Sequence, residues 1–161
     1  MFTKEVNVPD NIDKLLKITH RLDFFDTMSD RERLEVLKRL DANIIKYPKG
    51  TKIISAEAID LNIYFVLSGL VSIQKNETVN SALNLIKPGS FFGEMAFITR
   101  TTSGVSVIAN EDTAVLSMSN KEIKLLNILI REKIKDKIIF SLAKKLRFMN
   151  EMVNKMDEEN H

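Results

Sequence analysis

The sequence predicts a mainly β fold with flanking helices (α+β), in which about eight strands form an antiparallel β-roll or jelly roll. All five glycines lie between residues 50 and 104, so sharp turns are expected there. Short apolar or β-branched segments alternate with turn residues over the same part of the chain. Both flanks lack glycine and carry apolar residues at helical spacing, which predicts helices before and after the roll.

An N-terminal helical segment is expected over residues 1–40 of this chain, whose 161 residues fit one domain. A first helix is predicted at 11–20. Ser29 is predicted to cap a second helix at 30–40, because Glu32 stands three residues later and completes a capping box.

The β-roll is expected over residues 41–119. Strands are predicted at 43–47, 51–55, 63–67, 70–74, 82–86, 105–109 and 114–118. The turns between them include Pro48-Lys49-Gly50, Ser68-Gly69 and Lys87-Pro88-Gly89. Seven or eight short strands at nearly even spacing are typical of an antiparallel sandwich or barrel.

The C-terminal part is predicted to be helical again, with a hinge and dimerisation helices over 120–156. Ser119 or Asn120 is expected to cap a first short helix, and a longer helix follows from about 131 to 156. The last residues, 157–161, are expected to form a disordered tail.

Within the longer helix, six apolar residues alternate three and four positions apart, which is the a/d pattern of a coiled coil. They are Ile139, Leu142, Leu146, Met149, Val153 and Met156. This seam predicts a homodimer through the terminal helix, and the alternative is an amphipathic helix that docks on its own barrel. The nearby basic residues Lys144, Lys145 and Arg147 are interpreted as a solvated face.

Composition excludes several functional classes. The 24 basic and 22 acidic residues give a net charge of +2, a balance that argues neither for nor against a polyanionic partner. The chain has no cysteine and two histidines, at 20 and 161, so a metal site or catalytic triad is poorly supported. No apolar run has membrane-spanning length and the N-terminus lacks a signal-peptide core. We therefore expect a cytoplasmic protein with no catalytic residue, metal, cofactor or membrane contact.

The run at 88–98 is the most informative segment. It combines a proline, two glycines and one carboxylate, Glu94, between strand-like segments. This pattern predicts a turn with open backbone amides, followed by a short helical turn that carries Glu94. Such amides attract a phosphate, and the carboxylate beside them can accept hydrogen bonds from sugar hydroxyls. The segment therefore predicts binding of a sugar phosphate.

Four marks occur in the same order as in a known family. They are Phe24-Phe25 before a helix, Gly50 at the start of a strand, the run Ile63-Tyr64-Phe65-Val66-Leu67-Ser68-Gly69, and Phe92-Gly93-Glu94-Met95-Ala96. Over about residues 20–150 the chain resembles the cyclic nucleotide-binding domain family. That family provides the sensor module of catabolite-activator-type regulators, cyclic-nucleotide-dependent kinases and gated channels.

The resemblance implies a phosphate-binding cassette whose ligand is cAMP or cGMP. In the family, the Gly-Glu pair and nearby amides meet the ribose and phosphate, and an arginine about nine residues later pairs with the cyclic phosphate. Carried over to this sequence, the candidate ligand-binding residues are Phe92, Gly93, Glu94, Met95, Ala96, Arg100, Thr102, Ser103 and Gly104.

This sequence departs from the family pattern at the arginine. Ser103 stands in that position, followed by Gly104, and serine offers one hydroxyl and no charge. Losing a charge-assisted bond to a buried phosphate costs roughly 2–5 kcal/mol. Arg100 is either a substitute or a solvated loop residue, and Thr102 either contacts phosphate or stabilises a turn. A second departure is Glu57, where the family has glycine.

Three functions are compared. The first is a stand-alone sensor that binds a cyclic nucleotide or related anion and signals through a hinge near 120–131 into the terminal helices. The second is a degenerate cassette that serves as a scaffold for dimerisation and an unknown protein partner. The third is a transcription regulator, but the sequence ends about where a DNA-binding module would begin, so DNA binding is not expected.

Overall fold

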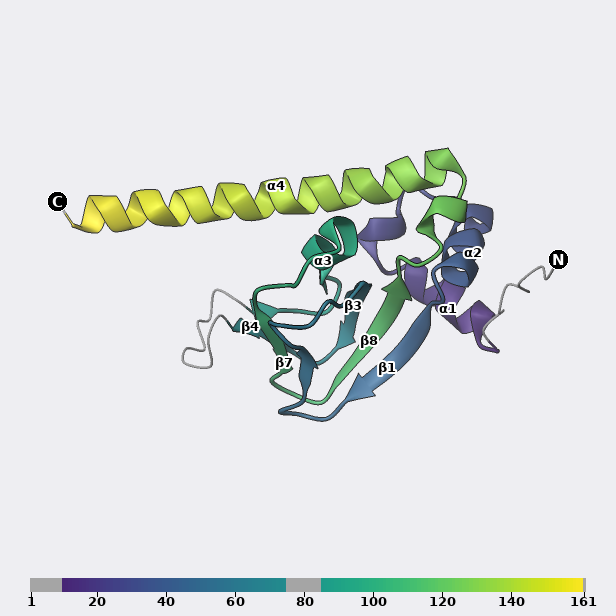
Figure 1. The fold of residues 1–161 in the computed structure, drawn as a ribbon, viewed down its shortest axis with the longest axis horizontal. Helices are drawn as coiled ribbons and strands as arrows, with labels where there is room; N and C mark the ends of the chain where they lie inside the picture. Colours follow the sequence, from purple (N-terminus) through teal and green to yellow (C-terminus); the bar gives the residue numbers. More distant parts are fainter. Residues whose placement is uncertain (1–9, 75–84, 161) are drawn as a thin grey trace.

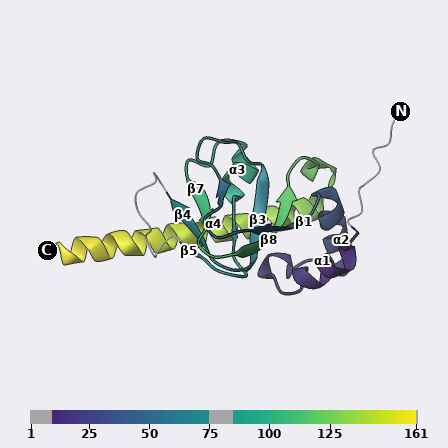
Figure 2. The same ribbon diagram turned by 90° about the horizontal axis from the view of Figure 1, so that it is seen from below.

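The protein is a β-roll with a helical pair at one end and a long helix across the top (Figure 1). This computed structural model describes residues 10–74 and 85–160. Helix α1 (Ile12–Thr19), the 3-10 turn η1 (Asp23–Phe25) and helix α2 (Asp30–Arg39) come first along the chain. Figure 2 shows that α1 and α2 lie at one end, while the C-terminal helix runs along the whole molecule.

The predicted capping box is present at the start of α2. The backbone N–H of Glu32 donates to Ser29 Oγ at 3.2 Å, and the backbone N–H of Ser29 donates to Glu32 Oε1 at 3.1 Å. These two bonds satisfy amides that the first helical turn leaves without partners.

Eight antiparallel strands form two four-stranded sheets in the described residues. The first sheet has the order β1 (Asn43–Tyr47), β8 (Thr113–Ser119), β3 (Asn62–Ser68) and β6 (Phe91–Phe92). The second has the order β2 (Lys52–Ile54), β7 (Ser106–Ala109), β4 (Val71–Gln74) and β5 (Leu85–Ile86). The fold class is confirmed. Of the predicted strand at 82–86, residues 82–84 lie outside the described part of the chain.

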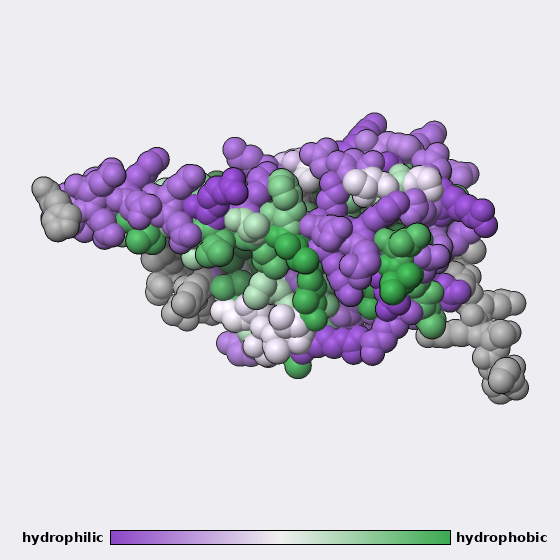
Figure 3. Space-filling view, turned by 90° about the horizontal axis from the view of Figure 1, so that it is seen from above, coloured by the Kyte–Doolittle hydropathy of each residue, from purple (hydrophilic) through white to green (hydrophobic). Residues whose placement is uncertain are grey.

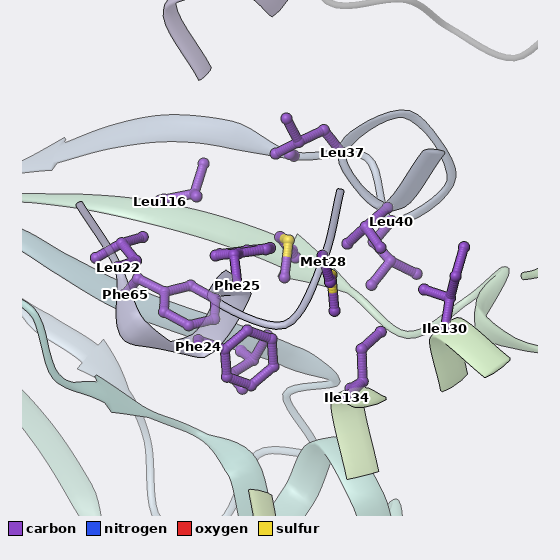
Figure 4. Close-up of a cluster of buried hydrophobic side chains, with 14 of the residues drawn as sticks. Leu22, Phe24, Phe25, Met28, Leu37, Leu40, Phe65, Leu116, Ile130 and Ile134 are labelled. Atoms are coloured by element: carbon purple, nitrogen blue, oxygen red, sulfur yellow. The ribbon is translucent and has the colours of Figure 1, made fainter. Parts of the chain in front are cut away.

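The two faces of β3 explain why the protein has two apolar clusters. Successive side chains of a strand point to opposite faces. Tyr64 and Val66 therefore join the cluster between the two sheets, whereas Ile63 and Phe65 join the cluster beneath the helices. Figure 4 shows this second cluster, where side chains from η1, α2, β3, β8 and the C-terminal helix meet.

The C-terminal helix α4 (Ile128–Glu159) is one continuous element of 32 residues. The predicted break near residue 131 is therefore wrong, and so is the disordered tail as far as Glu159. Residues 128–159 contain no glycine or proline to stop the helix. The helix is capped by Asn127, whose Oδ1 accepts the Leu129 N–H at 2.8 Å.

The predicted cap at Ser119 or Asn120 is also corrected. A 3-10 turn, η3 (Ile123–Leu125), precedes α4, and the residue before it is Glu122, which makes no side-chain cap bond. Asn120 is instead buried, with 2% of its surface exposed. Beyond this turn, α4 docks on the roll through a buried stripe at every fourth position, Ile130, Ile134 and Ile138.

Candidate functional site

The cassette begins at a turn that only glycine fits. Gly93 has φ of +86°, in the left-handed region, and a Cβ built there would lie 2.7 Å from the backbone oxygen of Asn62. Helix α3 (Glu94–Thr99) starts directly after it. Phe92, the residue before Gly93, is buried in β6 and stacks on Tyr64 at 5.0 Å between ring centroids. The predicted turn and short helix are thus both present.

Glu94 is a buried carboxylate, with 5% of its surface exposed. Its Oε1 accepts a hydrogen bond from the Lys145 ammonium, which reaches across from α4. Lys145 is exposed, as the interpretation of a solvated face predicts, but its ammonium also contacts this buried carboxylate. The sequence did not indicate this contact, because 51 positions separate the two residues and nothing local distinguishes Lys145 from its basic neighbours.

Ser103, which the resemblance aligns with the family arginine, has its hydroxyl engaged by backbone groups, at Val105 in its own turn and at the Ser55 carbonyl oxygen 3.5 Å away. The hydroxyl donates to the Val105 carbonyl at 2.5 Å, and its oxygen accepts the Val105 N–H at 3.4 Å. A serine has one proton to donate, so no donor remains for a phosphate in this arrangement. The next residue, Gly104, ties the turn to the loop after β2 through a 3.3 Å bond from its N–H to the Ala56 carbonyl oxygen.

The other polar side chains that were predicted to contact the ligand, Arg100 and Thr102, are exposed. Arg100 follows α3 in a left-handed conformation with φ of 57°. Among the described residues its side chain makes no recorded hydrogen bond or ion pair. Glu57 accepts a hydrogen bond from the Ser55 hydroxyl at 2.9 Å, so its turn is stabilised locally.

The remaining cassette residues divide by burial. Ala96 is buried, and Met95 is 53% exposed on the outer side of α3. Phe92, Gly93, Glu94 and Ala96 therefore form one compact turn against the roll, whereas Met95 faces outward.

Tyr64 lies beside Gly93 in the interior between the sheets, which confirms that it is packed. Its hydroxyl donates to Asp60 Oδ2 at 2.6 Å and accepts from Asn62 Nδ2 at 3.4 Å. Burial raises the pKa of Tyr64 above its ordinary value, and the bond to Asp60 raises it further. Val71, considered as a purine contact, is fully buried in the same cluster, and Leu83 lies outside the described residues.

Asn120 is a residue whose role the sequence did not reveal. Its Nδ2 donates to the carbonyl oxygen of Phe97 in α3 at 2.7 Å. Its Oδ1 is buried and has no partner among the described residues. Asn120 thus joins the end of β8 to the cassette helix, close to the point where the chain turns toward α4.

The predicted dimer seam is largely free of the roll. Leu142 packs against the core beneath the helices, whereas the other five residues are 55–62% exposed: Ile139, Leu146, Met149, Val153 and Met156. Seen from above, apolar side chains gather in a band across the face that α4 crosses (Figure 3). The buried stripe of α4 packs the helix against the roll, and most of the seam stays exposed on the surface.

Other kinds of site find little support in the described residues. A shallow depression of about 370 Å³ lies along β1 and β8, between Lys46 and Thr113, and includes no cassette residue. No group of three His, Cys, Asp or Glu side chains is arranged for a metal ion in residues 10–74 and 85–160. Within the same residues, no helix is long and apolar enough to cross a membrane.

Comparison with known proteins agrees with this geometry. A family profile described as the cyclic nucleotide-binding domain matches residues 44–127. Cyclic GMP-binding protein C of Dictyostelium discoideum is 29% identical over an alignment of 100 residues, which covers 59% of this chain and 4% of that protein. The cAMP-dependent protein kinase regulatory subunit of Aspergillus fumigatus is 33% identical over 95 residues, which are 59% of this chain and 22% of that protein. The chain therefore spans only a small part of either curated relative.

Solved structures show the same fold. A cyclic nucleotide-binding domain from Methylobacillus flagellatus has a TM-score of 0.73 at 16% identity, over 90% of this chain and 83% of that one. The catabolite activator protein of Thermus thermophilus has a TM-score of 0.67 at 24% identity, over 83% of this chain and 62% of that one. Since the profile covers more than half of the 161 residues and the cassette turn is present, the chain belongs to the cyclic nucleotide-binding domain family, whose members are regulatory binding domains rather than catalytic ones.

Proposed function

We propose that this chain is a regulatory sensor domain that binds cAMP, cGMP or a related small anion in the cassette and signals through α4. The observation that carries the proposal is the buried Glu94, which follows the left-handed Gly93 and directly contacts α4. A ribose hydroxyl can donate to such a carboxylate. The names of both curated relatives, a cyclic GMP-binding protein and a cAMP-dependent kinase subunit, support a ligand of this class.

The signalling route rests on two contacts between the cassette and the C-terminal part of the chain. Glu94 of α3 pairs with Lys145, and the Phe97 carbonyl of α3 accepts from Asn120. A ligand that binds one position of α3 better than another therefore also shifts α4. The free energy by which the ligand shifts this equilibrium equals the difference between its binding free energies to the two arrangements of α3 and α4.

Calorimetry and thermal unfolding with cAMP and cGMP test the proposal. A ligand at 100 times its Kd stabilises the folded state by about 2.7 kcal/mol, which is readily measured as a rise in Tm. We expect Glu94→Gln to weaken binding. The control Glu57→Gln should leave it unchanged, because the Glu57 carboxylate accepts a hydrogen bond from the Ser55 hydroxyl of its own turn. No rise in Tm at millimolar ligand would exclude the cyclic nucleotides.

A second candidate is a cassette that has lost its ligand and serves as a scaffold for a homodimer or a protein partner. The uncharged Ser103 with its engaged hydroxyl, the filled interior at Tyr64 and Phe92, and the exposed seam on α4 favour it. This candidate predicts dimers without ligand, and it predicts that Ser103→Arg raises anion affinity without changing the oligomeric state. We propose for either candidate a cytoplasmic protein without enzymatic activity or DNA binding.

A further inference from the structure

An anionic ligand in this cassette needs a positive charge that the usual position does not supply. Ser103 carries none, and its only hydroxyl proton is donated to Val105. Glu94 adds a negative charge to the buried turn, which repels a phosphate unless a cation accompanies it. The question is therefore which basic side chain stands close enough to balance both groups.

Lys145 is the cation that the fold brings to the cassette. It lies seven residues after Ile138 and three after Leu142, so it projects from the face of α4 that docks on the roll. Its ammonium bonds Glu94 Oε1. An ammonium has three N–H donors, and one contact to Glu94 leaves two. The side chain is 46% exposed, so those donors are accessible beside the cassette.

The other basic residues near the cassette are placed differently. Lys144 lies over the ring of Phe140 on α4, 5.5 Å from its centroid. Arg100 follows the opposite end of α3 from Glu94 and is exposed. Neither side chain has a recorded contact with the cassette carboxylate among the described residues.

We propose that Lys145 is the anion-binding residue of this cassette, so that the phosphate site is shared between the roll and α4. The inference rests on the proposed function. Glu94 holds the ammonium in place through Oε1, its carboxylate accepts from the ribose, and the free N–H groups of Lys145 bind the phosphate. Lysine acts here as a mobile point charge, in contrast to the rigid fork of an arginine.

This arrangement makes the charge of the ligand act on the position of α4. A phosphate binds its cation only while α4 is docked, so a charged ligand favours the docked helix over any other position. An uncharged nucleoside has the same ribose and base chemistry but gains nothing from Lys145. The ratio of the two affinities reports all contacts with the phosphate, and its change on replacing Lys145 measures this one contact.

The test compares ligands with and without phosphate on the full chain. Calorimetry measures binding of cAMP and cGMP, and of adenosine and guanosine, to the wild type, Lys145→Gln, Lys145→Arg and Lys144→Gln. We expect Lys145→Gln to weaken cyclic nucleotide binding roughly 10- to 100-fold, as for loss of a hydrogen bond to a charged group, and to leave nucleoside binding nearly unchanged. Lys145→Arg should retain most of the affinity, and Lys144→Gln should match the wild type.

Three other outcomes overturn the inference in distinguishable ways. Equal losses for cyclic nucleotide and nucleoside mean that Lys145 only holds α4 in place. Tighter cyclic nucleotide binding by Lys145→Gln means that Lys145 competes with the ligand for Glu94. If the wild type binds neither cyclic nucleotide, the proposed function fails for this class of ligand as well, and the contact between Glu94 and Lys145 does not serve a cyclic phosphate.

Discussion

Gly93 combines a left-handed backbone conformation with close packing of the cassette against β3. We expect Gly93→Ala to destabilise the protein beyond the left-handed penalty of about 1–2 kcal/mol, because its Cβ also meets the Asn62 backbone oxygen at 2.7 Å. Gly89→Ala is the matched control, since Gly89 has φ of +92° but nothing within 4 Å of the added Cβ. Urea unfolding measures both variants. Equal losses would show that the close approach to Asn62 has no energetic consequence.

Tyr64 makes the free energy of unfolding decrease at alkaline pH. Its pKa is raised by burial and by Asp60, so the folded state keeps the phenol protonated when the unfolded chain begins to ionise near pH 10. The stabilisation is complete below pH 10 and is lost as the pH rises toward the folded-state pKa. We expect Tyr64→Phe to lose about 0.5–1.5 kcal/mol at neutral pH, from the hydrogen bond to Asp60, and to show a shallower decline above pH 10.

The measurement is urea unfolding at a series of pH values from 8 to 11. Only one other tyrosine, Tyr47, is present in the chain, so the difference between wild type and Tyr64→Phe isolates one phenol. If the free energy of unfolding fell equally with pH in both proteins, the decline could not be attributed to the Tyr64 phenol.

At the scale of elements, α2 and α4 are joined by Glu32 and Lys133. The Glu32 carboxylate accepts from the Lys133 ammonium at 2.9 Å and also caps its own helix. The backbone bond from Ser29, followed by the bond from Lys133, lowers the pKa of Glu32 below its ordinary value of 4.5. The resulting stability is present above that value and is lost as the pH falls through the folded-state pKa.

Replacing Glu32 by Gln retains an acceptor for Ser29 but removes the charge. We expect a loss of roughly 0.5–1 kcal/mol at pH 7, which disappears in acid once the wild-type carboxylate is protonated. The control Glu132→Gln affects an exposed pair with Lys135 at 3.5 Å, so its effect should be close to zero. Thermal unfolding at pH 7 and pH 3 compares the two variants. If the loss of stability in Glu32→Gln persisted at pH 3, it could not be due to the charge of Glu32.

The elements that the sequence predicted well are those with local causes. The capping box needs only Ser29 and Glu32, and the strands follow from alternation between turns that contain glycine. The two-residue strand β6 was missed, because its pairing with Tyr64 and Phe65 leaves no periodic trace. The contacts of Lys145 with Glu94 and of Asn120 with Phe97 join residues 51 and 23 positions apart, and only the folded chain brings them together.

At the scale of the whole molecule, the exposed seam of α4 predicts a dimer. We expect the wild type to have twice the chain mass of 18.4 kDa in light scattering after gel filtration. Val153→Glu should give monomers, because it introduces two facing carboxylates into an apolar contact. Phe148→Glu changes an exposed aromatic residue off the seam and should remain dimeric. A wild type of 18.4 kDa would exclude dimerisation through this helix.

The length of α4 beyond its docked part turns a small motion into a large one. The helix projects past the roll toward its C-terminal end (Figure 1), and the residues after Lys145 extend about 21 Å at the rise of an α-helix. If α4 pivots by about 10° where Lys145 meets the cassette, the far end sweeps through roughly 4 Å. A small rotation of α4 about the Lys145 contact thus becomes a large displacement of its C-terminal end. A protein bound to that end would respond to whether the cassette is occupied.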